Sequence, residues 1–105
     1  MLYSGFSTRA IHAGNNADPV HGGVVPALDL STTFAQPEPG VPSSCFDYAR
    51  CGNPTVLALQ RNLASMESAK FAFALNCGMS ATVSVFSLLK QGDHMLCIDD
   101  VYGGT

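Results

Sequence analysis

Residues 71–98 combine two kinds of apolar pattern, and this constrains the fold more than any other feature of the chain. Residues 71–75 read Phe-Ala-Phe-Ala-Leu, which predicts a short strand that is buried on both faces. Residues 95–98 are continuously apolar and predict a second buried strand. After Gly78, apolar residues recur at helical spacing between the two. The order strand, helix, strand predicts parallel strands joined by a right-handed crossover.

Two parallel strands cannot cover both of their faces by themselves. The chain has 105 residues, enough for one small domain, and 47% of them are apolar while only 12% are charged. This balance argues against a disordered chain. We therefore expect an α/β fold that is present only in part.

The first 47 residues show no sustained apolar period, and they hold five of the six prolines. Such a stretch predicts an extended arm with turns rather than regular elements. Its apolar content favours docking onto other protein, for example a second subunit.

A helix start is predicted at Asn53-Pro54. Asparagine is a good N-cap, and proline suits the first helical position because its missing N–H would be unpaired there. Apolar residues then recur at helical spacing as far as Met66, and we expect the helix to end near Ser68. The predicted organisation is an inter-subunit arm over residues 1–52 and the truncated start of an α/β domain over residues 53–105.

Composition argues against several classes of function. The net charge is −3 and no basic stripe exists, so nucleic acid is not an expected partner. The four cysteines form no C-x-x-C pair and give no support to a metal site. The N-terminus lacks the apolar region of a secretory signal, and no apolar stretch is long enough to span a membrane. Free thiols and a cytoplasmic location are the expectation.

Three short segments carry candidate chemistry. Gly78 lies between the first predicted strand and the next helix, where free backbone N–H groups and the helix dipole attract anions. Glycine also allows a ligand to approach the backbone closely. Taken alone, an ordinary strand–helix turn is the commoner interpretation.

The second segment contains Tyr48 and Arg50. The planar guanidinium matches phosphate geometry, and a phenol two residues away can add a donor on the same side of an extended segment. An isolated arginine is more often a surface charge. The helix start that follows would give this pair a rigid support.

The third segment places Tyr102 just beyond the second predicted strand, before Gly103-Gly104. Open α/β sheets bind ligands at this end of their strands. The ring could stack on a flat heteroaromatic group, and the phenol could move a proton near a substrate amine. The alternative is a turn tyrosine packed against the core.

Together, longer stretches resemble the pyridoxal-phosphate enzymes of cysteine and methionine metabolism. This family includes cystathionine γ-lyase, cystathionine γ-synthase, cystathionine β-lyase and methionine γ-lyase, and the resemblance runs from about Ser7 to the last residue. It implies the arm plus the first helices and strands of the large domain of a fold-type I pyridoxal-phosphate transferase. The stretches that carry it are residues 10–14 (AIHAG), 30–34 (LSTTF), 48–55 (YARCGNPT) and 99–105 (DDVYGGT).

The resemblance also implies residue roles. Tyr48 and Arg50 match the pair that reaches across a dimer interface to the cofactor phosphate of the neighbouring subunit. Gly78 and Met79 match residues whose backbone amides hold the phosphate in their own subunit. Tyr102 matches the tyrosine that stacks on the pyridine ring and assists catalysis, and Arg50 and Tyr102 would also contact the amino-acid substrate. Complete members are homo-oligomers, dimers of dimers.

Two cysteines depart from the family pattern. Cys51 and Cys77 stand where a serine or another small residue is usual. A thiol donates a weaker hydrogen bond than a hydroxyl, so we expect a lower cofactor affinity near Cys77.

Among the family reactions, the resemblance is nearest to the γ-lyase, which cleaves cystathionine to cysteine, 2-oxobutanoate and ammonia. The three sister reactions stay open because they share these segments. Lys70 and Lys90 are the only lysines, and neither matches the lysine that forms the Schiff base with the cofactor. We therefore expect an N-terminal fragment that is inactive alone and buries too little surface to fold alone. The alternative is a non-catalytic short subunit that docks on full-length copies.

Overall fold

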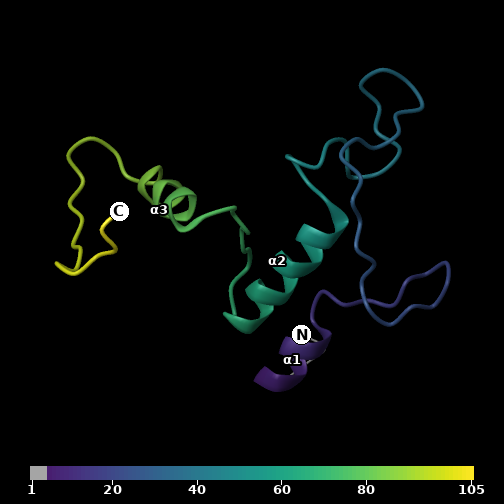
Figure 1. Ribbon diagram of the computed structural model, residues 1–105, viewed down its shortest axis with the longest axis horizontal. Helices are drawn as coiled ribbons and strands as arrows, with labels where there is room; N and C mark the ends of the chain where they lie inside the picture. Colours follow the sequence, from purple (N-terminus) through teal and green to yellow (C-terminus); the bar gives the residue numbers. More distant parts are fainter. Residues whose placement is uncertain (1–4) are drawn as a thin grey trace. The chain divides into compact units, whose positions relative to one another are not determined.

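The computed structural model describes residues 5–105, and the regular elements in that range are three helices. They are α1 (Phe6–His12), α2 (Pro54–Met66) and α3 (Gly78–Phe86), labelled in Figure 1. The chain divides into two compact units. The first ends at Ala74 and contains α1 and α2; the second is Leu75–Thr105 and contains α3. The predicted domain boundary at residue 52 stays a prediction.

Helix α2 begins as predicted. The Asn53 side chain accepts hydrogen bonds from the amides of Thr55, at 2.9 Å, and Val56, at 3.4 Å, and Pro54 opens the helix. Asn53 is only 7% exposed, so the capping side chain is buried. This start depends on local sequence, which is why the sequence could predict it.

Helix α2 ends at Met66, two residues before the expected position. Ser68 has φ 54°, and its amide donates to the Ser65 carbonyl at 3.2 Å. The Ala69 amide donates to the Ala64 carbonyl at 2.8 Å. This pair of bonds is the Schellman motif, with serine in the left-handed position that glycine usually takes.

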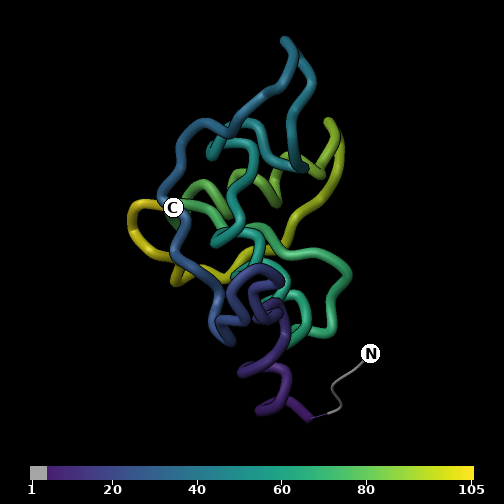
Figure 2. The backbone as a smooth tube through the Cα atoms, turned by 90° about the vertical axis from the view of Figure 1, so that its right-hand side faces the viewer, coloured from purple at the N-terminus to yellow at the C-terminus, as the bar shows by residue number. Residues whose placement is uncertain are grey.

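The prediction that residues 1–47 hold no regular element was wrong, because α1 forms within them. Figures 1 and 2 both show α1 beside α2. The Asn62 side chain on α2 donates to three carbonyls at the end of α1, those of Arg9, Ala10 and Ala13, at 3.3, 3.0 and 2.8 Å. The Gly5 N-cap of α1 makes no side-chain hydrogen bond. Contacts with α2, rather than a local signal, therefore hold α1, and periodicity could not reveal it.

Gly14 allows the close approach of α1 to α2. Its φ is +77°, and a Cβ atom there would lie 2.4 Å from the Ala58 carbonyl oxygen. No larger residue fits both the backbone conformation and the space. The glycine therefore fixes where the chain leaves α1 and passes α2.

Residues 15–52 contain turns and isolated bridges. Thr33 pairs with Tyr48, and Glu38 pairs with Val41, both in antiparallel fashion. The Ala49 amide donates to the Thr32 carbonyl at 2.7 Å. These bonds tie two distant parts of the arm together beside the segment that carries Tyr48.

In the second unit, α3 begins at Gly78 as predicted, but the strand predictions were wrong. Neither residues 71–75 nor residues 95–98 form a strand in the part of the chain described. Phe73 is 80% exposed, and Leu96 is fully exposed at 102%. Strand hydrogen bonds need a neighbouring strand, and none lies alongside either segment within residues 5–105. The apolar pattern marks segments suited to burial, and this chain does not supply the burial.

Candidate functional site

A cavity of about 390 Å³ in the second unit collects the residues that the sequence singled out there. Gly78, Met79 and Tyr102 all line it. The start of α3 and the final turn of the chain thus share one cavity, although more than twenty residues separate them in sequence. Its remaining lining residues are Cys77, Thr82, Gly104 and Thr105.

The N-cap of α3 is Cys77, a role that the sequence reasoning missed. Its sulfur accepts a hydrogen bond from the Ser80 amide at 3.4 Å and lies 3.2 Å from the Ser80 hydroxyl. The Ser80 hydroxyl in turn donates to the Asn76 side chain at 3.0 Å. A small side chain with an acceptor atom directly before a predicted helix start was the signal that could have found it.

These contacts lower the pKa of the Cys77 thiol from its ordinary value of 9.0. The largest cause is the hydrogen bond with the Ser80 side chain, followed by that from the Ser80 amide, and the Met79 amide adds to them. Desolvation opposes the shift. Hydrogen bonds donated to the sulfur favour the thiolate, as the start of a helix does in general. The Ser80 hydroxyl carries one proton, so it can donate to the sulfur only in place of Asn76.

Tyr102 lies on a tight turn that ends the chain. The Thr105 amide donates to the Tyr102 carbonyl at 2.7 Å, which closes the turn. A Cβ atom on Gly104 would lie 2.9 Å from Cε1 of the Tyr102 ring, so the glycine lets the backbone lie against the ring edge. Tyr102 is itself 84% exposed, which leaves the ring open to a ligand.

Tyr48 and Arg50 belong to the first unit. The Arg50 guanidinium carbon lies 5.1 Å from the centroid of the Tyr48 ring, within the range of a cation–π contact. Arg50 also lines a cavity of about 420 Å³ at the start of α2, together with Gly52, Asn53 and Gln60. The pair is therefore brought together, and the role of each residue in binding stays a prediction.

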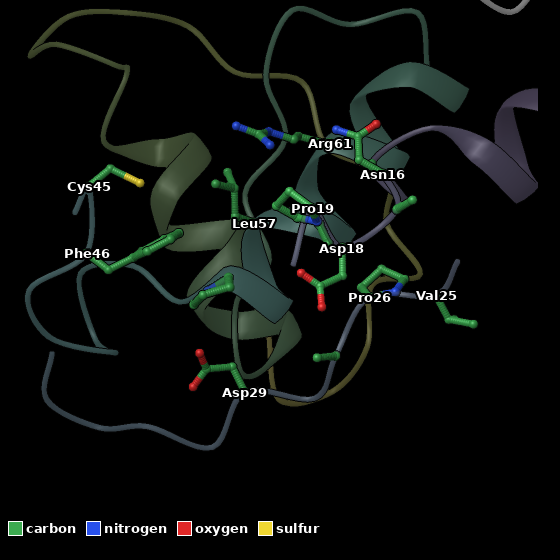
Figure 3. A pocket seen from close by; sticks show the side chains of 15 residues that line it. Asn16, Asp18, Pro19, Val25, Pro26, Asp29, Cys45, Phe46, Leu57 and Arg61 are labelled. Atoms are coloured by element: carbon green, nitrogen blue, oxygen red, sulfur yellow. The ribbon is translucent and has the colours of Figure 1, made fainter. Parts of the chain in front are cut away.

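The first unit holds another cavity of about 420 Å³, shown in Figure 3, that the sequence reasoning did not predict. Polar side chains, among them Asp18, Asp29 and Arg61, share it with apolar residues such as Phe46 and Leu57. The pKa of Asp18 is lowered from 3.8, chiefly by the Val20 amide and then by the His21 side chain. The Asp18 carboxylate therefore has a structural role, because these bonds hold a local turn together.

The donor chemistry fits a phosphorylated heteroaromatic cofactor. The first-turn amides of α3 have no carbonyl partner one turn earlier, and the helix dipole favours an anion there. The Tyr102 ring lines the same cavity, and a Cβ atom on Gly78 would meet nothing within 4 Å, so the backbone is open to a ligand. Among residues 5–105, no group of three acidic, histidine or cysteine side chains could hold a metal ion. The helices described there are too short or too polar to cross a membrane.

Comparisons with known proteins all point to one enzyme family. The sequence pattern of the family described as "Cys/Met metabolism PLP-dependent enzyme" matches residues 7–105. Cystathionine gamma-lyase of Dictyostelium discoideum is 48% identical over 98 residues, which are 93% of this chain and 25% of that protein. Cystathionine beta-lyase of Coxiella burnetii is 43% identical over 102 residues, 97% of this chain and 26% of that protein.

Solved structures agree. The crystal structure of cystathionine gamma-lyase from yeast matches with a TM-score of 0.85 and 40% identity, covering 99% of this chain and 26% of the yeast chain. The chain thus spans about a quarter of the length of the relatives that it matches. The similarity extends over almost every residue of this chain, including the segments around Tyr48, Gly78 and Tyr102. The chain belongs to the family of pyridoxal-phosphate-dependent enzymes of cysteine and methionine metabolism.

Proposed function

We propose that this chain forms part of a carbon–sulfur lyase of transsulfuration, of the cystathionine γ-lyase type. Relatives with that name are 46–48% identical over more than nine-tenths of the chain. With one water, the reaction converts cystathionine to cysteine, 2-oxobutanoate and ammonia. The observation that carries the proposal is the shared cavity of Gly78, Met79 and Tyr102 in a chain of this family.

Pyridoxal phosphate, when bound, supplies the electron sink that this chemistry requires. The backbone amides of Gly78 and Met79 would hold its phosphate, because amides in the first turn of a helix have no carbonyl partner within the helix. Tyr102 would stack on its ring, and its phenol would hold or move a proton near the substrate amine. Arg50 and Tyr102 would also contact the amino-acid substrate.

Tyr48 and Arg50 would bind the cofactor phosphate of a neighbouring subunit. Arginine stays charged and offers a planar fork, and the phenol adds a donor. This role requires a homo-oligomer in which the arm of one subunit reaches the next. The first unit supports the role through the contact between Arg50 and Tyr48 beside the start of α2.

The lysine that bonds the cofactor would come from sequence beyond these 105 residues. The Lys70 ammonium, in the first unit, lies 5.2 Å from the centroid of the Phe71 ring. Lys90 lies in a turn where its amide bonds the Asp93 side chain at 2.8 Å. We accordingly propose that the chain is inactive alone, and the cytoplasm remains the predicted compartment.

A hybrid enzyme tests this function. This chain would replace the matching quarter of the yeast cystathionine γ-lyase, with the remaining yeast sequence unchanged. We expect the hybrid to retain pyridoxal phosphate and to release 2-oxobutanoate from cystathionine. Pyruvate as the main product would instead favour the β-lyase reaction, and a folded hybrid that binds no cofactor would contradict the proposal.

A non-catalytic docking subunit is the second candidate. The apolar side chains left exposed in the second unit favour it, for example Leu96, Phe86 and Val83. A tagged 105-residue chain would then co-purify with a full-length homologue without adding activity. Failure to associate would rule this candidate out.

A further inference from the structure

Two side chains at the start of α2 hold a distant part of the arm. The Thr55 hydroxyl donates to the Ala27 carbonyl at 3.1 Å and accepts from the Asp29 amide at 2.8 Å. The Asn53 side-chain amide donates to the Asp29 carbonyl at 3.1 Å. Three hydrogen bonds therefore fix residues 27–29 against the N-terminus of the helix.

The loop that follows Asp29 leads back to the start of α2. Past Asp29, the Phe34 amide donates to the Asp47 carbonyl at 2.9 Å, beside the Thr33–Tyr48 bridge. The Gly52 amide then donates to the Tyr48 carbonyl at 3.1 Å, in the turn that leads into the helix. The loop carrying Tyr48 and Arg50 is thus tied to the same helix start at both of its ends.

We propose that Thr55 is a positioning residue for Arg50. Its hydroxyl sets where residues 27–34 lie, and these residues pair with the segment that presents the guanidinium. A bidentate contact between arginine and phosphate needs a fixed orientation, so loss of this anchor weakens phosphate binding although Thr55 touches no ligand. The inference rests on the proposed function, in which Arg50 binds the cofactor phosphate.

The test measures the dissociation constant of pyridoxal phosphate for the hybrid enzyme. Thr55→Val keeps the side-chain shape and removes the hydroxyl, and we expect about 10-fold weaker binding, since two hydrogen bonds are lost. Thr55→Ser keeps the hydroxyl and should restore the affinity. Thr8→Val, on an exposed position of α1, is the matched control and should change nothing.

A double-mutant cycle separates positioning from a general structural effect. In the Arg50→Ala background, Thr55→Val should cause no further loss, because the group that it positions is already gone. An equal loss in both backgrounds would overturn the inference. If the Thr55→Val hybrid does not fold, the same double-mutant cycle can be measured with Thr55→Ala.

The outcomes for the two proposals differ. If Arg50→Ala weakens cofactor binding and Thr55→Val does not, only the positioning role is wrong. If Arg50→Ala has no effect, the proposed role of Arg50 is wrong and the inference falls with it.

Discussion

The Arg9 guanidinium on α1 donates a hydrogen bond to the Ser65 carbonyl on α2 at 2.6 Å. The same group reaches the Ser68 hydroxyl at 3.0 Å, where α2 has just ended. In the other direction, the Asn62 side chain on α2 donates to carbonyls at the end of α1. Each helix therefore has at least one carbonyl near its C-terminus that accepts a hydrogen bond from a side chain of the other.

Asn62→Ala should release α1 from α2. It removes the side-chain donor from three partly buried carbonyls, of which that of Arg9 keeps the Ala13 amide, so amide exchange over residues 5–14 should be about 10-fold faster. Hydrogen–deuterium exchange on the hybrid enzyme measures this. Arg61→Ala, at the exposed neighbouring position, is the control, and equal protection in both variants would contradict the reciprocal capping.

Gly14→Ala should destabilise the protein more than Gly22→Ala. Both glycines have positive φ, +77° and +72°, but only Gly14 has a backbone atom, the Ala58 oxygen, within 2.4 Å of the added Cβ. Gly22→Ala should cost about 1 kcal/mol for its conformation, and Gly14→Ala about 2 kcal/mol more for the clash. Unfolding midpoints of the hybrid enzyme in urea would compare the two, and equal midpoints would refute the close approach.

Cys77 should react with iodoacetamide at lower pH than the same thiol in the unfolded chain. Its folded-state pKa lies below the ordinary 9.0, mainly because of the Ser80 side chain. The linked stabilisation of α3 is therefore fully present above the unfolded pKa and is lost as the pH falls through the folded value. Alkylation rates at Cys77, followed by mass spectrometry from pH 6 to pH 10, would give both curves, and coincident curves would disprove the thiolate contacts.

Gly104→Ala should weaken cofactor binding in the hybrid, whereas Gly103→Ala should not. The Cβ atom added at Gly104 would lie 2.9 Å from Cε1 of Tyr102, but at Gly103 it meets nothing within 4 Å. A displaced ring would lose part of its stacking energy, so we expect about 5-fold weaker binding. Cofactor titration distinguishes the variants, and equal affinities would show that the Tyr102 turn does not support the ring.

Local signals in the sequence predicted α2 and the start of α3, although α3 ends at Phe86 and not near Lys90 as its apolar spacing predicted. Asn53 and Pro54 form a start that needs no tertiary help, and Gly78 marks the beginning of α3. Helix α1 escaped prediction because Asn62, some fifty residues away, satisfies its end. The two strand predictions were wrong because an apolar pattern indicates burial against neighbouring segments, and the described residues provide no such neighbours.

The candidate site shows the same division. Gly78, Met79 and Tyr102 share a cavity, and their roles in binding stay predictions. The cap by Cys77 and the anchor by Thr55 depend on particular hydrogen bonds, one to a sulfur and two across a distance of more than twenty residues. Residue patterns indicate which groups are present but not these pairings.

In the proposed function the chain contributes to two sites, with Arg50 serving a neighbouring subunit and Tyr102 serving its own. Mixing hybrid subunits that carry Arg50→Ala with subunits that carry Tyr102→Ala tests it directly. Each variant alone should have little activity toward cystathionine. In mixed dimers one site regains both groups, so a random equal mixture should recover about a quarter of the unmodified activity. No recovery in mixtures shown to contain mixed dimers would contradict the claim.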